Sequence, residues 1–438
     1  MRSLSSFLLL VLALGCGDDD SSTPTADGGT TADASEPESG LRSGAPVTFA
    51  EVYTATRYTE GGYDRAWLPK DLSVHPDGQL WVVQQMERDG SFTDEDECTE
   101  RGLGGAANDC VGQQGSTVAI TDPAALEPAS DANGRVRLVV DANSWHFMRR
   151  PSGIAFGAEA LTLDPSDPGA EETGITAPVT FTNTFATCHE HFTGNPTDTA
   201  PYIGPTVWTA DPAIYDGTNG SFSWSNGSHL DMVHATQYCM GIAYEGENKY
   251  WLFDGANGFL DYYDFGKPHH PGHYDHSDFV VERYLMPEGD ELARVPGVPS
   301  NLHVDGRTLW VADTGNGRVL AFDLDSPTTQ FGTYRTMENT SAPTFDGLAF
   351  ATVLDSAVLG AEWGGAVEPS GLAQLPDGTL AVASHATGHV TLFDADGTVV
   401  RTIDSGTGAG LGGMTQIDGT LYVVQMEARQ ILRVDVAE

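Results

Sequence analysis

Short apolar strands recur along this chain, and each group opens with an apolar or Pro-Ser stretch that a tight turn joins to a second strand. Six openings share this pattern, at 71–74, 151–156, 240–244, 299–304, 369–374 and 412–417. Second strands follow at 80–83, 250–253, 309–312, 380–383 and 421–424, and third strands at 259–265, 318–322 and 389–393. Units of two or three short strands cannot bury their own apolar face, so the copies must stack or close into a ring.

The first turn of four copies is an Asp-Gly pair. These pairs are Asp77-Gly78, Asp305-Gly306, Asp377-Gly378 and Asp418-Gly419. Asp-Gly between alternating apolar residues is a strong signal for a two-residue hairpin, because both turn positions need positive φ. The pattern therefore predicts antiparallel hairpins throughout.

The stretch Val311-Ala-Asp-Thr-Gly-Asn-Gly-Arg-Val319, with its Pro299-Ser300 opening, resembles an NHL repeat. The resemblance is strong at 299–323, 369–395 and 412–435, fair at 240–265, and weak at 71–84 and 151–184. Six such units imply an all-β, six-bladed β-propeller over residues 48–438. The stretch 48–53 is expected to supply the outer strand of the last blade and close the ring. A β-sandwich of unrelated hairpins is the alternative, but sandwiches do not repeat their turn chemistry.

The chain starts with Met1-Arg2-Ser3, an apolar run at 7–14, and Gly15-Cys16. This order describes an export signal whose apolar run is too short to span a bilayer. The run ending in Cys16 resembles a bacterial lipobox, which implies lipidation of Cys16; an ordinary cleaved signal is the alternative. Residues 17–45 hold almost no large apolar side chain and read as a flexible tether. We therefore expect a signal peptide at 1–15, a lipidated Cys and disordered tether at 16–47, and a protein anchored to a bacterial membrane, in the periplasm or at the cell surface.

The charge balance limits the partners. Lys and Arg number 21 against 62 Asp and Glu, a net charge of −41. Such a surface repels nucleic acid and anionic lipid, so we expect membrane contact only through the lipid anchor. We expect the protein to act as a monomer.

Four cysteines remain besides Cys16. Their even number after export favours disulfides, and the loop layout suggests Cys98–Cys110 and Cys188–Cys239. Neither pair has the CxxC spacing of a thiolate metal site.

Aligning the copies places a polar residue at the end of each second strand. These six residues are Gln84, Asn183, Asp254, Asp313, Ser384 and Gln425. In a propeller they would gather at one mouth of the central channel. They either line a wet channel end or form a site for a small polar ligand or a divalent cation, with Asn183, Asp254 and Asp313 suited to Ca²⁺.

Histidines sharpen this hypothesis. His189, His191, His234 and His385 are expected at the same mouth, and imidazoles from separate loops are a usual way to hold Zn²⁺. The alternative is that each one packs or hydrogen-bonds locally. His303 lies near the axis, facing the channel or packing. A second group of histidines at 269–278 has a spacing that allows metal binding, although such loops are usually just exposed.

Two classes of function remain open. The first is a binding module for a small ligand or a protein, with a recognition surface built by insertions at 85–118 and 185–238. The second is a metal-dependent enzyme. Six-bladed propellers of this kind resemble the peptidyl-α-hydroxyglycine amidating lyase, which implies zinc, with Glu190, Tyr238 or Asp254 as the base. A gluconolactonase-type hydrolase with Ca²⁺ is a further possibility. Fold alone decides none of these.

Overall fold

The structure is a computed structural model, and it describes residues 47–55, 57–60, 63–87, 115–141, 144–157, 160–167, 170, 175–191, 204–215, 227–273, 276–336 and 340–436. The predicted signal peptide, nearly all of the predicted tether, and Cys16, Cys98 and Cys110 lie outside these residues.

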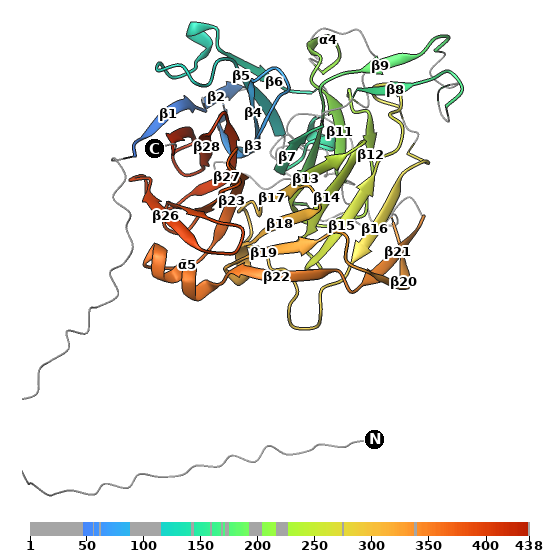
Figure 1. The fold of residues 1–438 in the computed structure, drawn as a ribbon. Helices are drawn as coiled ribbons and strands as arrows, with labels where there is room; N and C mark the ends of the chain where they lie inside the picture. The colour runs from blue at the N-terminus through green and yellow to red at the C-terminus, as the bar shows by residue number, and fades with distance from the viewer. Residues whose placement is uncertain are drawn as a thin grey trace, which may run out of the picture. The chain divides into compact units, whose positions relative to one another are not determined.

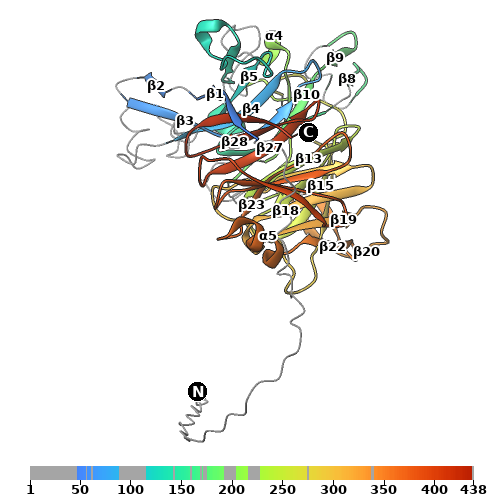
Figure 2. The same cartoon turned by 60° about the vertical axis from the view of Figure 1, so that its left-hand side comes forward.

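The described residues form a six-bladed β-propeller, as predicted (Figures 1 and 2). Each blade is an antiparallel sheet of four strands. The inner strands are β3 (Tyr63–Val74), β7 (Pro151–Phe156), β13 (Cys239–Gly246), β17 (Leu302–Asp305), β23 (Pro369–Gln374) and β27 (Leu411–Ile417). The second strands are β4 (Leu80–Glu87), β10 (Thr184–His189), β14 (Lys249–Asp254), β18 (Thr308–Asp313), β24 (Leu380–Ser384) and β28 (Thr420–Gln425).

The third and fourth strands complete the blades toward the outside. The third strands are β5 (Gly115–Ile120), β11 (Thr206–Thr209), β15 (Phe259–Asp264), β19 (Arg318–Asp323), β25 (His389–Phe393) and β29 (Gln430–Asp435). The outer strands are β6 (Val136–Val139), β12 (Asp231–Met232), β16 (Val280–Tyr284), β22 (Ala349–Leu354), β26 (Val399–Asp404) and β1 (Phe49–Thr54). Blade numbers below follow this order.

The first strand of the propeller closes the ring, which confirms the expectation for 48–53. β1 pairs antiparallel with β29, with Phe49 opposite Val434 and Thr54 opposite Gln430. Each inner strand also contacts the inner strands of both neighbouring blades, from β3 through β7, β13, β17 and β23 to β27 and back to β3. Figure 1 shows these six strands gathered around the middle of the ring.

The Asp-Gly turns differ in detail from the prediction. Both turn residues have positive φ only at Asp418-Gly419, with φ of 49° and 84°. At Asp77-Gly78 the glycine alone has positive φ, 88°, and the Asp77 carboxylate accepts the backbone N–H of Gln79 at 3.1 Å. An aspartate that caps its own turn in this way can remain at ordinary φ, so that turn is a longer one.

Apolar side chains pack between adjacent blades, as expected for the aromatic residues of the second strands. Trp81 on β4 is 1% exposed, and its ring centroid lies 5.5 Å from those of Phe156 and Phe185 of blade 2. Tyr250, Trp310 and Tyr422 occupy related second-strand positions and are also buried. The core is therefore a ring of interfaces between blades.

Blade 2 departs most from the sequence prediction. A separate hairpin, β8 (Leu161–Leu163) and β9 (Val179–Phe181), is inserted between β7 and β10. The second, third and outer strands of this blade therefore lie at 184–189, 206–209 and 231–232, almost entirely within the insertion predicted at 185–238. The sequence misled because β9 has the strand-like composition expected of the second strand.

Additional elements decorate the blades. β2 (Arg57–Glu60) extends blade 1, and the hairpin β20 (Thr329–Arg335) and β21 (Ser341–Asp346) extends blade 3, with β21 parallel to β16. The short helical elements are η2 (Asp131–Asn133), α2 (Ser144–Phe147), α4 (Pro212–Tyr215), η4 (Thr314–Asn316) and α5 (Ser356–Trp363). Over the described residues, none of the helices has the length and apolar character that crossing a membrane requires.

Candidate functional site

The polar residues at the ends of the second strands are buried and form hydrogen bonds with nearby turns, links or strands. Gln84, Asp254, Asp313, Ser384 and Gln425 end or lie near the end of a second strand, and each is fully buried. The sixth residue, Asn183, does not lie at the end of a second strand as predicted. It precedes β10 and lines a cavity between blades 1 and 2. The equivalent position in blade 2 is His189, which pairs with Pro151 as Asp254 pairs with Cys239.

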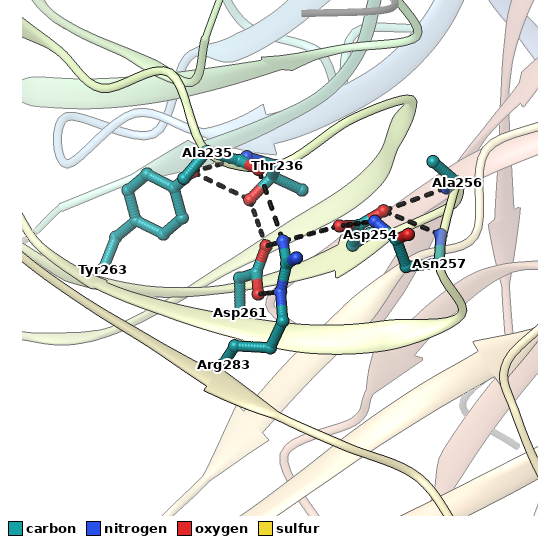
Figure 3. A network of polar contacts seen from close by, with 8 residues as sticks. All are labelled: Ala235, Thr236, Asp254, Ala256, Asn257, Asp261, Tyr263 and Arg283. Atoms are coloured by element: carbon teal, nitrogen blue, oxygen red, sulfur yellow. Dashed lines mark hydrogen bonds and ion pairs between the residues drawn. The ribbon is translucent and has the colours of Figure 1, made fainter. Parts of the chain in front are cut away.

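Asp254 is the centre of a buried ion-pair network (Figure 3). Its Oδ1 accepts the backbone N–H groups of Ala256 and Asn257 at 2.9 and 3.0 Å, which fixes the turn after β14. Its Oδ2 accepts Arg283 Nη2 at 2.7 Å, and the same guanidinium donates to both oxygens of Asp261. Burial and the neighbouring Asp261 carboxylate raise the pKa of Asp254 to about 6, against the opposing effect of Arg283. These contacts occupy both oxygens of the predicted base and metal ligand.

The other strand ends repeat this logic. Asp313 accepts the N–H of Ala293 and the side chains of Asn316 and Arg318, at 2.8, 2.8 and 2.7 Å. Ser384 Oγ accepts the N–H of Thr387 at 3.2 Å. Gln84 differs, because its Nε2 donates to Ser116 Oγ on the neighbouring strand β5 at 3.0 Å. The structure therefore does not bring Asn183, Asp254 and Asp313 together as the Ca²⁺ hypothesis requires.

Two of the predicted catalytic residues do meet, through a shared arginine. Glu190 is 3% exposed and accepts Arg294 Nη1 at 2.7 Å and the backbone N–H of Gly297 at 2.9 Å. The same guanidinium carbon lies 4.1 Å from the centre of the Tyr238 ring. Lys70 donates to the carbonyl of Gly297 at 2.6 Å. The segment linking blade 3 to blade 4 is thus held against blades 1 and 2 by charged groups.

The predicted zinc ligands engage protein groups. His189 is buried, with Nδ1 3.0 Å from Gly204 O and Nε2 3.2 Å from Thr187 Oγ1. Burial lowers the pKa of His189 to about 3. His234 is buried, and His385 Nδ1 lies 2.9 Å from Glu368 Oε2 in blade 5.

Those four histidines do not assemble a metal centre. His191 follows His189 at the end of the described segment and is half-buried. Over the part of the chain that the structure describes, a single group of three or more potential ligands gathers for a metal, and it contains none of His189, His191, His234 and His385. It consists of His229, His269 and His276, of which the sequence analysis had pointed only to the segment 269–278.

The disulfide between Cys188 and Cys239 is present, as predicted. It joins β10 of blade 2 to the start of β13 in blade 3, with the two Cα atoms 5.6 Å apart. Ser152 Oγ lies beside it and donates to the carbonyl of Cys239 at 2.5 Å. The inner parts of these two blades are therefore covalently tied.

The axis of the propeller is filled by two polar side chains. When the inner strands are aligned, the position of Gly153 is also glycine in three other blades, at Gly241, Gly371 and Gly413, whereas it is Asp71 in blade 1 and Asn301 in blade 4. Asn301 Nδ2 donates to Asp71 Oδ1 at 3.0 Å, and both side chains are buried. A Cβ at Gly413 would overlap Asp71 Oδ1, so this position must be glycine for the pair to fit.

The pair also satisfies backbone donors of other blades. Asp71 Oδ2 accepts the N–H of Ile154 at 3.0 Å. Asn301 Oδ1 accepts the N–H groups of Met414 and Leu372 at 2.9 and 3.3 Å. Burial raises the pKa of Asp71 to about 6, although these hydrogen bonds oppose the rise. Five of the six blades thus meet at one polar junction.

A cavity of about 280 Å³ adjoins this junction on the axis. Residues from the inner strands of all six blades line it, including Asp71 and Asn301. Small side chains at equivalent positions, Ser73, Ala155, Ala243, Ala373 and Thr415, leave the space open, and His303 occupies the sixth position. Half-buried polar groups face it, namely His303, Gln374 and Gln416.

His303 belongs to a short polar chain at this cavity. Its Nε2 lies 3.3 Å from Gln374 Oε1, and Gln374 Nε2 donates to Asp305 Oδ2 at 2.9 Å. Because a glutamine oxygen only accepts, Nε2 of His303 carries a proton. Burial lowers the pKa of His303, so the ring is neutral at neutral pH. The cavity therefore offers neutral hydrogen-bonding groups beside a carboxylate whose oxygens already accept hydrogen bonds from Asn301 and Ile154.

The sequence alone did not reveal that Asp71 and Asn301 form a pair on the axis. The signal was available in the aligned openings, where four glycines are interrupted by two residues that can hydrogen-bond. Only ring closure shows that positions 230 residues apart face each other.

Neither a protein-family model nor a curated protein matches the chain. Among solved structures, it is similar to an auxiliary nutrient binding protein from Bacteroides thetaiotaomicron, at 10% identity and a TM-score of 0.46, over 89% of this chain and 76% of that one. It is also similar to virginiamycin B lyase from Staphylococcus aureus, at 9% identity and a TM-score of 0.39, over 84% of this chain and 95% of that one. At identities of 9–10% and TM-scores below 0.5, these likenesses do not indicate what this chain binds.

Proposed function

We propose that this propeller is an exported, lipid-anchored binding protein that holds a small, uncharged polar molecule in its axial cavity. The observation that carries the proposal is the cavity of about 280 Å³, which lies beside the Asp71–Asn301 junction and is lined by every blade. Pockets for small ligands are concave and carry a few placed polar groups, and typically measure about 300–1,000 Å³. This cavity suits a ligand at the small end of that range.

The chemistry of the lining supports an uncharged ligand. The carboxylate of Asp71 already accepts hydrogen bonds from Asn301 and Ile154, so it is not a free counter-ion for a cation. His303 is neutral, and the glutamines offer both donors and acceptors. A net charge of −41 disfavours the approach of anions. Neutral molecules with several hydroxyl or amide groups fit these conditions best.

The anchor proposed at Cys16 complements this role. A tethered propeller that binds a solute needs access to the surroundings and no catalytic group at the cavity. The charged residues predicted for catalysis, Glu190 and Asp254, are each held by an arginine instead.

A thermal-shift screen tests the proposal. The probes are neutral monosaccharides, polyols and amides, with amines and carboxylates of similar size beside them. A binding compound at about 100 times its Kd stabilises the folded state by about 2.7 kcal/mol. We expect some neutral compounds to raise the Tm and charged ones to have less effect.

A cavity-filling variant connects a positive result to the site. Thr415 lines the cavity and is half-buried, so Thr415→Phe is expected to fill it and abolish the shift. Thr352→Phe on the exposed outer strand β22 is the matched control and should keep the shift. An equal shift in both variants would place binding elsewhere.

A further inference from the structure

Three histidines from two blades meet at the outer edge of blade 2, away from the axial cavity. His229 lies just before the outer strand β12, whereas His269 and His276 belong to the segment between β15 and β16 of blade 3. One ring nitrogen from each lies within 4.8 Å of the others. His229 and His269 are buried and His276 is nearly so.

Backbone hydrogen bonds hold the two segments together. The N–H of His269 donates to the carbonyl of Leu230 at 2.9 Å, and the N–H of Gly272 donates to the carbonyl of His229 at 2.9 Å. The blade 3 segment therefore lies along the edge of blade 2. The meeting of the histidines follows from this register and does not depend on a chance contact of side chains.

Contacts at Nδ1 orient the rings of His269 and His276. His269 Nδ1 lies 2.7 Å from the carbonyl of His270, which only accepts, so the proton sits on Nδ1. The Nε2 atom of this buried ring has no hydrogen-bond partner among the described residues and keeps its lone pair. His276 Nδ1 lies 2.8 Å from Oδ1 of the fully buried Asp231 and 3.3 Å from the backbone N–H of Met232.

The Asp231–His276 pair has the arrangement that commonly stands behind a metal ligand. Histidines that bind metals usually donate their other N–H to a carboxylate or carbonyl, which orients the ring and increases its basicity. Here both forms occur, a carboxylate behind His276 and a carbonyl behind His269.

The third ring is positioned by packing. His229 stacks on Phe147 of α2, with ring centroids 3.8 Å apart and planes 19° apart. The preceding residue, Ser228, donates both its N–H and its hydroxyl to the buried carboxylate of Asp141, at 2.9 and 2.6 Å. The segment that carries His229 is thus ordered by the link between blades 1 and 2.

We propose that His229, His269 and His276 together bind one Zn²⁺ ion, which clips the outer edge of blade 2 to the β15–β16 segment of blade 3. Three imidazole nitrogens suit zinc, with a water as the fourth ligand. Nitrogens on a tetrahedral zinc at about 2.05 Å lie about 3.3 Å apart, so the rings close slightly on binding. The disulfide Cys188–Cys239 ties the same two blades nearer the axis, and the metal does so at the periphery.

Metal binding by the full chain, purified without an affinity tag and stripped with a chelator, tests this site. The probes are Zn²⁺, with bound metal measured by elemental analysis, and Co²⁺, whose visible absorption reports a tetrahedral site. We expect one ion per molecule and a tetrahedral Co²⁺ spectrum. His276→Ala should lose both, and His389→Ala, which removes a histidine of blade 5 outside the group, should keep both.

A second variant tests the site without removing a proposed ligand, so that lost metal binding cannot be attributed to misfolding alone. Asp231→Asn keeps all three ligands and weakens the hydrogen bond behind His276, so we expect about 10- to 100-fold weaker Zn²⁺ binding with unchanged stoichiometry. Circular dichroism checks that each variant is folded. The proposal is overturned if the parent binds no stoichiometric metal, if a folded His276→Ala protein binds it as tightly as the parent, or if Asp231→Asn leaves the affinity unchanged.

Discussion

The side-chain amide of Asn301 donates a hydrogen bond of 3.0 Å to the buried carboxylate of Asp71, across the axis of the propeller and over 230 residues of sequence. The other four blades have glycine at the equivalent position, and at one of them, Gly413, an added Cβ would overlap the Asp71 carboxylate. The two side chains thereby close the ring at its centre with polar contacts and border the cavity that we propose as the binding site.

Exchanging the two residues is the sharpest test of this junction. In Asp71→Asn alone, amide donors face each other or the N–H of Ile154, and one unmet buried group costs about 1–3 kcal/mol. In Asn301→Asp alone, two carboxylates meet, which costs more. In the double exchange, an amide at 71 donates to a carboxylate at 301, which still accepts from Leu372 and Met414. Urea unfolding should show the double variant to be more stable than either single variant; additive losses would contradict the pairing.

The network around Arg283 makes a pH-dependent prediction. Arg283→Met leaves the buried carboxylates of Asp254 and Asp261 without their cation, and we expect a loss of about 3–5 kcal/mol near pH 8. The pKa of Asp254 is already raised to about 6 from 3.8, and removing the cation raises it further. A carboxyl with a raised folded-state pKa costs stability that begins above its unfolded pKa, grows until the pH reaches the folded-state pKa, and stays at its maximum at higher pH. The loss should therefore be full at pH 8 and smaller near pH 5, where protonation of the folded protein relieves it.

The matched control for this variant is Arg307→Met. Arg307 is half-exposed and pairs with Asp325 and Glu245 at the surface. Exposed pairs typically contribute about 0.2–1 kcal/mol, so this change should be small. Chemical unfolding at pH 5 and pH 8 measures both variants, and an equal loss for Arg283→Met at the two pH values would count against buried carboxylates as its cause.

The disulfide between blades 2 and 3 should contribute strongly to stability. Cys188 and Cys239 are separated by 51 residues, and closing a loop of this size is expected to stabilise the fold by about 4 kcal/mol through the unfolded chain. Replacing both cysteines with serine should lower the free energy of unfolding, measured by urea denaturation, by that amount. Reductant should lower the stability of the parent by about this amount more than that of the double variant, in which only Cys98–Cys110 could still be reduced. An equal effect of reductant on both proteins would contradict this assignment.

Lipidation at Cys16 predicts where the protein is found. Two acyl chains confer stable membrane attachment, at about 0.8 kcal/mol for each buried CH₂ group. Cys16→Ser should move the protein from the membrane fraction to the soluble fraction, as measured by cell fractionation and immunoblotting. Cys98→Ser, the matched cysteine control, should remain with the membrane. Membrane association of the Cys16→Ser protein would argue against the anchor.

The repeat predicted the fold because blade formation depends on local signals. Openings, turns and second strands carry these signals within about forty residues, typical of propeller repeats. The prediction was wrong at one point in blade 2. There, strand β9 of the inserted hairpin was mistaken for the second strand, so Asn183 was assigned to the strand-end position that His189 holds.

The sites were harder to predict because they depend on partners distant in sequence. Asp254 looked like a free carboxylate, yet Arg283 on the outer strand of the same blade neutralises it. His229 gave no signal at all, because its companions His269 and His276 come from the next blade. Polar residues at the strand ends suggested a wet channel end or a ligand site. Only the contacts show that a residue such as Asp254 is buried and caps a turn.

Isothermal titration of the most stabilising neutral compound into the parent, Thr415→Phe and Thr352→Phe proteins tests the central claim most directly. We predict one binding site per molecule, at least about tenfold weaker binding in Thr415→Phe because the side chain occupies the cavity, equivalent to about 1.4 kcal/mol, and unchanged binding in Thr352→Phe. Binding to Thr415→Phe that is as tight as to the parent, or no binding of any neutral compound to the parent, would contradict the claim that the axial cavity is the ligand site.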